Sequence, residues 1–155
     1  MFFKNKLLYF VSIFLLIPIN ALFAGFAAGT LIKVPGGYRE IEQLKQGDFV
    51  YSVNKNGSIS INKITKTTSY FSSKAICIVL YEDVIITALK QKLYELNGNQ
   101  WIKAKSIVSN MQLLSGNNKK AMVYDVSIID QEIEFFDIRL DDVHTFCVST
   151  DDICT

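Results

Sequence analysis

The chain has 155 residues, of which 50% are hydrophobic, 20% are charged and only two are prolines. This composition excludes disordered tails, collagen-like repeats and low-complexity linkers, and the length favours one globular domain. Sixteen lysines and arginines are scattered among 15 acidic residues, for a formal net charge of +1. Nucleic-acid-binding proteins usually carry a basic stripe, so we expect no nucleic-acid partner.

The first 24 residues differ in composition from the rest of the chain. Lys4 and Lys6 form a basic start, and Leu7–Ile19 is an almost wholly apolar run. Small residues follow at Ala21, Ala24, Ala27 and Ala28. This pattern predicts a secretory signal peptide over residues 1–24, followed by one domain over residues 25–155. The apolar run is shorter than the roughly 20 residues that span a bilayer, so an uncleaved membrane anchor is the alternative.

A signal peptide implies a secreted or otherwise extracytoplasmic protein, with membrane contact only if the segment stays uncleaved. The cleavage site stays open: cleavage after Ala24 places Leu22 three positions back, whereas cleavage after Ala27 places the small Gly25 there. Removal of residues 1–24 leaves 14 lysines and arginines against 15 acids, so the mature domain is nearly neutral.

Three cysteines, Cys77, Cys147 and Cys154, would enter an oxidising compartment on export. An odd number does not imply a disulfide framework, and their disulfide state stays open. The apolar neighbours of each cysteine favour a small buried hydrophobe. There is no Cys-x-x-Cys spacing and His144 is the only histidine, so we expect no metal site and no cofactor.

The domain is predicted to be all-β, because its segments are short, rich in Ile, Val, Tyr, Phe and Thr, and separated by turn residues. No segment requires a helix longer than two turns. Asn56-Gly57 supplies the positive backbone angles of a tight hairpin. Strands are predicted at residues 30–34, 38–41, 49–53, 58–64, 74–80, 84–87, 122–129, 132–140 and 145–148, with turns at 35–37 and 97–98.

An internal repeat relates the stretch that begins at Tyr38 to the stretch that begins at Trp101, at an offset of 63 residues. Gly47 coincides with Asn110 in this register. Glycine and asparagine are the residues that most easily adopt a left-handed backbone, so the pair predicts one short turn used twice. The repeat indicates a pseudo-twofold β domain, with chance similarity as the alternative. Trp101 and the pair Phe135-Phe136 are predicted to be core residues.

The stretch GFAAGTLIKVPGGYREIEQLKQGDFVYS, from Gly25, resembles the opening of a Hint (Hedgehog/intein) domain. That family shares a Cys-F-x-x-G-T start, an I-E-x-L element and a G-D before a strand. The resemblance continues in QKLY and NQWIKA and closes with FFDIRLDDVHTFCVSTDDICT from Phe135. It covers residues 25–155 and implies an all-β, pseudo-twofold horseshoe.

The resemblance also implies self-cleavage at the domain's N-terminal end. In this family a first-residue Cys attacks the preceding carbonyl. A Thr-x-x-His element polarises the scissile amide and protonates its nitrogen, and a later Asp and His assist proton transfer. Here Gly25 occupies the nucleophile position. Two registers are open for Thr-x-x-His: Thr87 places Lys90 at the histidine position, and Ala88 places Gln91 there.

Asp137 in F-F-D-I and His144 in D-V-H-T-F match the two later family positions. The chain ends at Ile153-Cys154-Thr155, where the splicing members of the family continue with His-Asn. We therefore expect a Hint domain with a degenerate site, whose family positions are Gly25, Thr87, Gln91, Asp137 and His144.

Two other functions stay open. One is a secreted, non-catalytic β-domain that binds an unidentified protein, as part of a toxin or surface system. The other is residual self-processing by Cys147 or Cys154 with His144. Cys147 lies three residues from His144 and would face the opposite side of a strand, which argues against that pair. With a signal peptide that ends at the start of the Hint stretch, we also expect no upstream segment to splice.

Overall fold

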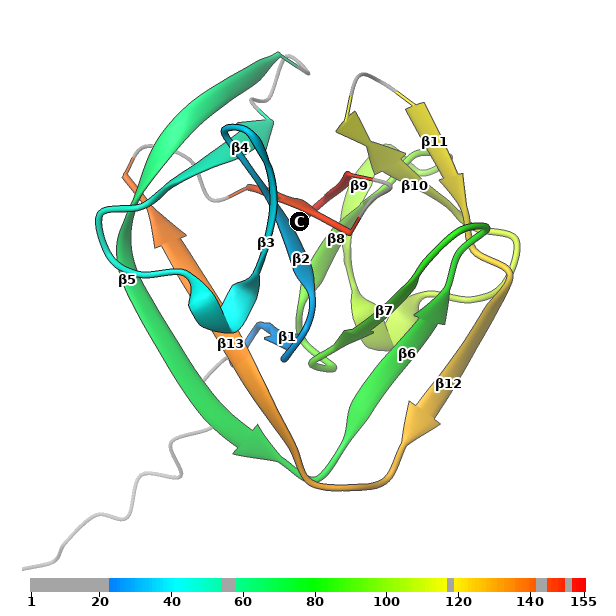
Figure 1. Cartoon of the computed structure of the whole chain (residues 1–155). Coiled ribbons are helices and arrows are strands. Elements are labelled where there is room, and N and C mark those ends of the chain that lie inside the picture. The colour runs from blue at the N-terminus through cyan, green and yellow to red at the C-terminus, as the bar shows by residue number, and fades with distance from the viewer. Residues whose placement is uncertain (1–22, 54–57, 117–118, 142–144, 150–151) are drawn as a thin grey trace, which may run out of the picture.

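Figure 1 shows the computed structural model, which describes residues 23–53, 58–116, 119–141, 145–149 and 152–155. These residues form short strands and two single 3-10 turns, so the all-β prediction is confirmed. The elements are β1 (Phe26–Ala27), β2 (Leu31–Val34), β3 (Gly37–Glu40), η1 (Ile41–Gln43), β4 (Phe49–Val53), β5 (Ile59–Ser72), β6 (Ala75–Val79), β7 (Val84–Thr87), β8 (Lys92–Glu95), β9 (Gln100–Lys103), η2 (Ala104–Ser106), β10 (Gln112–Ser115), β11 (Lys119–Met122), β12 (Asp125–Ile129), β13 (Ile133–Leu140), β14 (Cys147–Val148) and β15 (Ile153–Cys154).

The internal repeat is present in the fold. The hairpin β2–β3, the turn η1 and strand β4 recur as β8–β9, η2 and β10, and the two halves lie on either side of the molecule in Figure 1. Gly47 has φ 97° and Asn110 has φ 69°, as the matched pair predicts. Each also donates its backbone N–H over 2.8 Å to a carbonyl beyond the next hairpin, Gly47 to Ile64 and Asn110 to Val123. The same turn is therefore used twice.

The strands form two sheets in the described part of the chain. One has the order β12-β6-β7-β1-β13-β5-β4, and the other has the order β3-β2-β14-β15-β10-β8-β9, with β11 paired to β10. The C-terminal strands β14 and β15 join the halves, because β14 pairs with β2 and β15 pairs with β10. Strand β1 lies in the centre of the first sheet, between β7 and β13.

Most predicted strands agree with the structure to within one or two residues at each end, but larger differences occur at several positions. Strand β5 runs to Ser72, well past the expected end at residue 64, because it pairs along the whole length of β13. The predicted strand 122–129 is two strands in different sheets, β11 and β12. Strands β1, β8, β9, β10 and β15 were not predicted. The predicted turn at Asn56-Gly57 lies outside the described residues.

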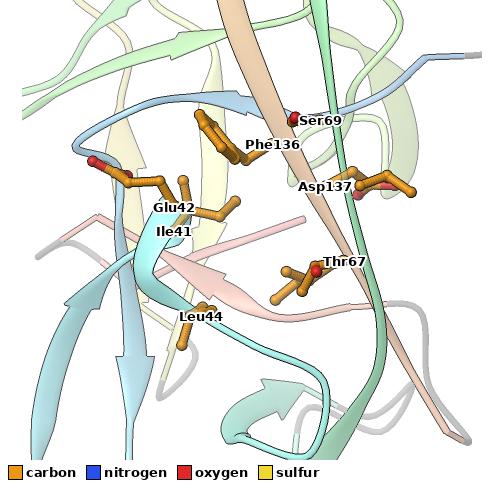
Figure 2. A pocket seen from close by; sticks show the side chains of 9 residues that line it. Ile41, Glu42, Leu44, Thr67, Ser69, Phe136 and Asp137 are labelled. Carbon is orange, nitrogen blue, oxygen red and sulfur yellow. The ribbon is translucent and has the colours of Figure 1, made fainter.

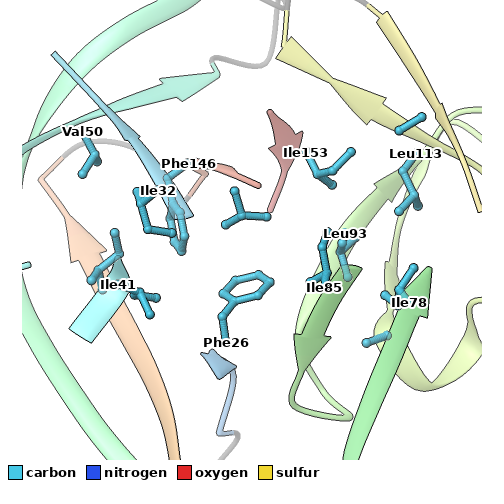
Figure 3. Close-up of a cluster of buried hydrophobic side chains, with 14 of the residues drawn as sticks. Phe26, Ile32, Ile41, Val50, Ile78, Ile85, Leu93, Leu113, Phe146 and Ile153 are labelled. Atoms are coloured by element: carbon cyan, nitrogen blue, oxygen red, sulfur yellow. The ribbon is translucent and has the colours of Figure 1, made fainter. Parts of the chain in front are cut away.

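The main core lies between the two halves. Phe26 is fully buried there, and its ring meets the ring of Phe146 edge-on at a centroid distance of 6.0 Å. Figure 3 shows the Phe26 ring between a group that contains Ile32 and a group that contains Leu93. Strand β1 therefore contributes to both halves of the core, although the structure assigns it only two residues.

The aromatic residues that were predicted as core do not all lie there. Phe135 is fully buried and Phe136 is partly buried against the main core. Trp101 is 42% exposed, so its prediction as a core residue was wrong. It lies on the edge strand β9 and packs edge-on against Tyr94 across the β8–β9 pair, on the face directed away from the core. None of the described residues belongs to a helix long and apolar enough to cross a membrane.

Candidate N-terminal processing site

Gly25 enters the fold immediately before strand β1. Phe26 pairs with Phe136 on β13 and with Thr87 on β7, so the chain at Gly25 runs between these two strands. Upstream, the ring of Phe23 stacks on Tyr70 of β5, with ring centroids 4.3 Å apart. The peptide that links Ala24 to Gly25, the position of the scissile bond in the Hint resemblance, is therefore held on both sides by packed residues.

The backbone of Gly25 makes three hydrogen bonds at the end of β7. Its N–H donates to Oε1 of Gln91 over 2.8 Å. Its carbonyl accepts from the hydroxyl of Thr87 over 2.8 Å and from the N–H of Ala88 over 3.0 Å. The side chains of Thr87 and Gln91 are buried, so these bonds are shielded from water.

In the structure, the two residues that contact Gly25 come from different registers of the Thr-x-x-His element. Thr87 comes from the first register and Gln91 from the second, and both contact Gly25. Lys90, the alternative at the histidine position, is exposed. The reason is a turn in which the N–H of Gln91 donates to the carbonyl of Ala88 over 3.1 Å, which directs Gln91 back toward Thr87.

The orientation of the Gln91 amide follows from its partners. A backbone N–H can only donate, so Oε1 must face Gly25. The other end of the amide, Nε2, donates to the carbonyl of Lys92 over 3.1 Å. Gln91 therefore accepts a hydrogen bond from the N–H of residue 25 and presents no donor to it. Cleavage of an amide needs the opposite, because the departing nitrogen must gain a proton.

There is no space for a side chain at residue 25. A Cβ built on Gly25 lies 2.6 Å from the carbonyl oxygen of Phe136 and 3.5 Å from Cβ of Phe135. The backbone of Gly25 also has φ 139°, a conformation that residues with a side chain rarely adopt. A cysteine nucleophile at the position that the family uses for it would therefore require the β1–β13 pairing to shift.

Asp137 lies on β13, next to Phe136, and lines a cavity of about 220 Å³. Figure 2 shows Asp137 with Thr67, Ser69, Phe136 and the residues of η1 around this cavity. Burial raises the pKa of the Asp137 carboxyl, although the N–H of Ile138 and the charge of Arg139 oppose the shift. Burial and the charge of Asp137 raise the pKa of Tyr70 to about 12.

The remaining predicted residues have separate locations. His144 lies outside the described residues. Asp48, the acidic residue of the G-D element, caps a turn: its carboxylate accepts from the N–H of Lys45 over 2.9 Å. Cys147 and Cys154 are buried and Cys77 is half-buried. The described residues contain no group of three His, Cys, Asp or Glu side chains that could hold a metal ion.

Sequence reasoning missed the contacts made by Phe136, Ala88 and Phe23. The first two act through backbone atoms. The carbonyl oxygen of Phe136 fills the space beside Gly25, and the N–H of Ala88 donates to the carbonyl of Gly25. Backbone roles leave no residue-type signal in a sequence. Phe23 falls within the apolar leader-like segment, where one more aromatic residue does not stand out.

Replacement of Gln91 with leucine is expected to lower the free energy of unfolding by about 1–3 kcal/mol, because it leaves the buried N–H of Gly25 without an acceptor. Thr87→Val is the matched control. It removes one donor to the Gly25 carbonyl, which keeps the Ala88 N–H, so a smaller loss of about 1 kcal/mol is expected. Urea denaturation of both variants measures the difference, and equal losses would contradict this role for Gln91.

Asp137→Asn is expected to stabilise the protein at neutral pH by a few tenths of a kcal/mol. Burial raises the pKa of Asp137 in the folded state above its unfolded value of 3.8, so the folded state binds more protons between these two values. Stability therefore falls as the pH rises through this window, and the loss persists above it. Urea denaturation near pH 7 and near pH 3 tests this, because the gain should vanish at the lower pH, where the carboxyl is neutral.

Comparison with known proteins agrees with this fold. The sequence model of the pretoxin HINT domain matches residues 31–155. The chain belongs to the pretoxin Hint domain family. No curated protein sequence matches this chain, whereas many solved structures do.

The solution structure of a bacterial intein-like domain from Clostridium thermocellum has a TM-score of 0.79 and 21% identity, over 84% of this chain and 96% of the other. The gp41-1 intein has a TM-score of 0.70 and 20% identity, over 86% and 98%. The TvoVMA intein has a TM-score of 0.76 and 11% identity, over 84% and 96%. At these identities the likeness establishes the Hint fold, and the chemistry must be argued from the site itself.

Proposed function

We propose that this protein is an exported Hint domain that has lost self-cleavage at its N-terminal end and keeps the site as a structural anchor. The observation that carries this proposal is the closed position at Gly25, where a Cβ would lie 2.6 Å from the Phe136 carbonyl oxygen. The Hint fold itself makes the chain a member of an autoprocessing family.

The chemistry supports the same conclusion. In an N-to-S acyl shift, a bond forms between the side-chain sulfur of residue 25 and the carbonyl carbon of residue 24, the bond from that carbon to the nitrogen breaks, and the nitrogen gains a proton. Glycine provides no attacking atom. Gln91 is a neutral amide that accepts from this nitrogen, so it cannot supply the proton.

The three hydrogen bonds to Gly25 have a structural role in this proposal. They fix the entry of β1 between β7 and β13, which places Phe26 in the centre of the core. A geometry that in the family surrounds a scissile bond here holds the start of β1 in the folded state.

Burial of Phe26 also bears on export. Cleavage after Ala27 would remove both residues of β1, including the fully buried Phe26, whereas cleavage after Ala24 leaves β1 intact. This supports a mature protein that begins at Gly25. N-terminal sequencing of the exported protein tests this part: a start at Gly25 is expected, and an intact leader would indicate an anchored protein.

A fusion protein tests the loss of cleavage. A reporter domain is placed before Phe23, so that Phe23, Ala24 and the whole Hint domain are kept, and the intact mass is measured with and without dithiothreitol or hydroxylamine. A single uncleaved mass is expected in all cases. A reporter fragment that ends at Ala24 would overturn the proposal. The same fusion to a Hint domain with a first-residue cysteine provides the positive control.

The pretoxin name of the family supports the alternative function, a non-catalytic β-domain that binds a protein of a toxin or surface system. This alternative also predicts an uncleaved fusion. It differs in requiring a protein partner that binds the folded domain with defined stoichiometry.

A further inference from the structure

Two cysteines lie together in the C-terminal hairpin, away from Gly25. Strands β14 and β15 run antiparallel, and Cys147 pairs directly with Cys154 in their register. Both cysteines are buried, with exposed fractions of 0% and 1%. The proposed function uses neither of them.

The backbone hydrogen bonds show whether Cys147 and Cys154 are a hydrogen-bonded or a non-hydrogen-bonded pair of the β14–β15 ladder. Phe146 and Thr155, the next residues outward, exchange both N–H···O bonds at 3.1 Å. Hydrogen-bonded and non-hydrogen-bonded pairs alternate along an antiparallel ladder, so Cys147 and Cys154 form a non-hydrogen-bonded pair. Side chains approach most closely in such pairs, where the Cα atoms lie about 4.5 Å apart, within the range that a disulfide bridges.

The two side chains also share one face of the hairpin. Phe146, Val148 and Ile153 point into the main core. Because side chains alternate along a strand, Cys147 and Cys154 point to the other face, where they form a separate small cluster with Val53 and the partly buried Leu114. The two sulfur atoms are thus directed toward each other within one enclosed cluster.

The electrostatic surroundings favour reaction between these thiols. A hydrogen bond from Cys154 lowers the pKa of Cys147, and this effect outweighs burial and the charge of Asp152, which raise it. The Lys33 ammonium, which pairs with Asp152, also lowers the pKa of Cys147. The same hydrogen bond and burial raise the pKa of Cys154. Cys147 is therefore the better thiolate and Cys154 the thiol that remains protonated, an arrangement suited to thiol–disulfide exchange.

We propose that Cys147 and Cys154 form a cross-strand disulfide that closes the C-terminal hairpin. In this reaction the two thiols lose two protons and two electrons, an S–S bond forms, and a small-molecule or protein disulfide is reduced to two thiols. The bond forms by exchange while the hairpin folds, before Val53 and Leu114 cover it. It links the strand that pairs with β2 to the strand that pairs with β10, so it stabilises the junction of the two halves.

Cys77 serves as an internal control. It lies on β6 in the other sheet, opposite Ile86 and Ser127, and it is half-buried. The proposal therefore predicts one free thiol and one disulfide in the oxidised protein, and three free thiols in the reduced protein.

The test uses the protein refolded with glutathione disulfide, then denatured and alkylated without reductant. No lysine or arginine follows Arg139, so trypsin leaves both cysteines in one C-terminal peptide. In the oxidised protein, the mass of this peptide should be lower by two hydrogen atoms and the peptide should carry no alkyl group. Cleavage before Asp151 separates Cys147 from Cys154, and the two fragments should stay joined until reductant is added. The oxidised protein should also melt about 5–10 °C above the reduced one.

Two variants sharpen the result. Cys77→Ser should keep the disulfide and the difference in melting temperature, whereas Cys154→Ser should lose both. Alkylation of all three cysteines after oxidation, or a disulfide that contains Cys77, would overturn the proposal. Because neither readout depends on cleavage at Gly25, these outcomes are independent of the proposed loss of self-cleavage.

Discussion

Gly25→Ala is expected to lower the free energy of unfolding by about 3 kcal/mol, the sum of a strained backbone and a steric overlap. The new Cβ would lie 2.6 Å from the carbonyl oxygen of Phe136, and this oxygen belongs to the strand pairing of β1 with β13. The strand must shift to admit it. Urea denaturation of the variant and of the native chain measures the loss.

Gly37→Ala is the matched control for this substitution. Gly37 has φ 148°, close to the 139° of Gly25, but nothing lies within 4 Å of a Cβ built on it. It should therefore lose only the backbone component, about 1 kcal/mol. Equal losses at the two positions would show that the contact with Phe136 has no effect and that residue 25 has room for a side chain.

The same argument predicts that Gly25→Cys does not restore thiol-dependent cleavage. The cysteine meets the Phe136 carbonyl, and Gln91 still accepts from the nitrogen that must gain a proton. The reporter fusion with Gly25→Cys should stay uncleaved. Gly25→Cys combined with Gln91→His supplies both groups but leaves the contact with Phe136, so it should also stay uncleaved. Cleavage in the double variant alone would contradict the steric argument and identify Gln91 as the decisive loss.

Phe26→Ala is expected to have the largest effect on stability, a loss of about 3–5 kcal/mol. Phe26 is fully buried between the two halves, so its removal leaves a cavity in the centre of the core. The loss should appear as a lower midpoint of urea denaturation with an unchanged slope.

Phe71→Ala is the matched control, because it makes the same substitution at an exposed position. Phe71 is 64% exposed on β5, so its truncation should change the free energy of unfolding by less than about 0.5 kcal/mol. Similar losses for Phe26→Ala and Phe71→Ala would contradict the central position of Phe26 in the core.

Much of the fold could be predicted because it depends on local signals. The residue types of Gly47 and Asn110 indicate the repeated turn, since few other residues adopt a positive φ without strain. Short β-branched and aromatic segments predict strands. The extension of β5 to Ser72 and the separation of β11 from β12 could not be predicted, because they depend on which distant strand each segment pairs with.

The site was predictable only where it depends on side chains. The loss of the nucleophile at Gly25 and of the imidazole near Thr87 can be read directly from the residues. The pairing of Thr87 with Gln91 depends on the turn between Ala88 and Gln91, which the spacing of a motif does not contain. Trp101 shows the same limit, since an edge strand exposes a residue whose type favours the core.

The sequence by itself determined the all-β class, the repeat, the Hint resemblance and the absence of an attacking atom at residue 25, because each depends on residue type and order. Only the tertiary structure decided that the Phe136 carbonyl closes this position, that Gln91 accepts where the family needs a donor, and that Cys147 faces Cys154. The first two facts join residues that are far apart in the chain, and the third depends on the register of the β14–β15 pair; all three arise only when the sheets form.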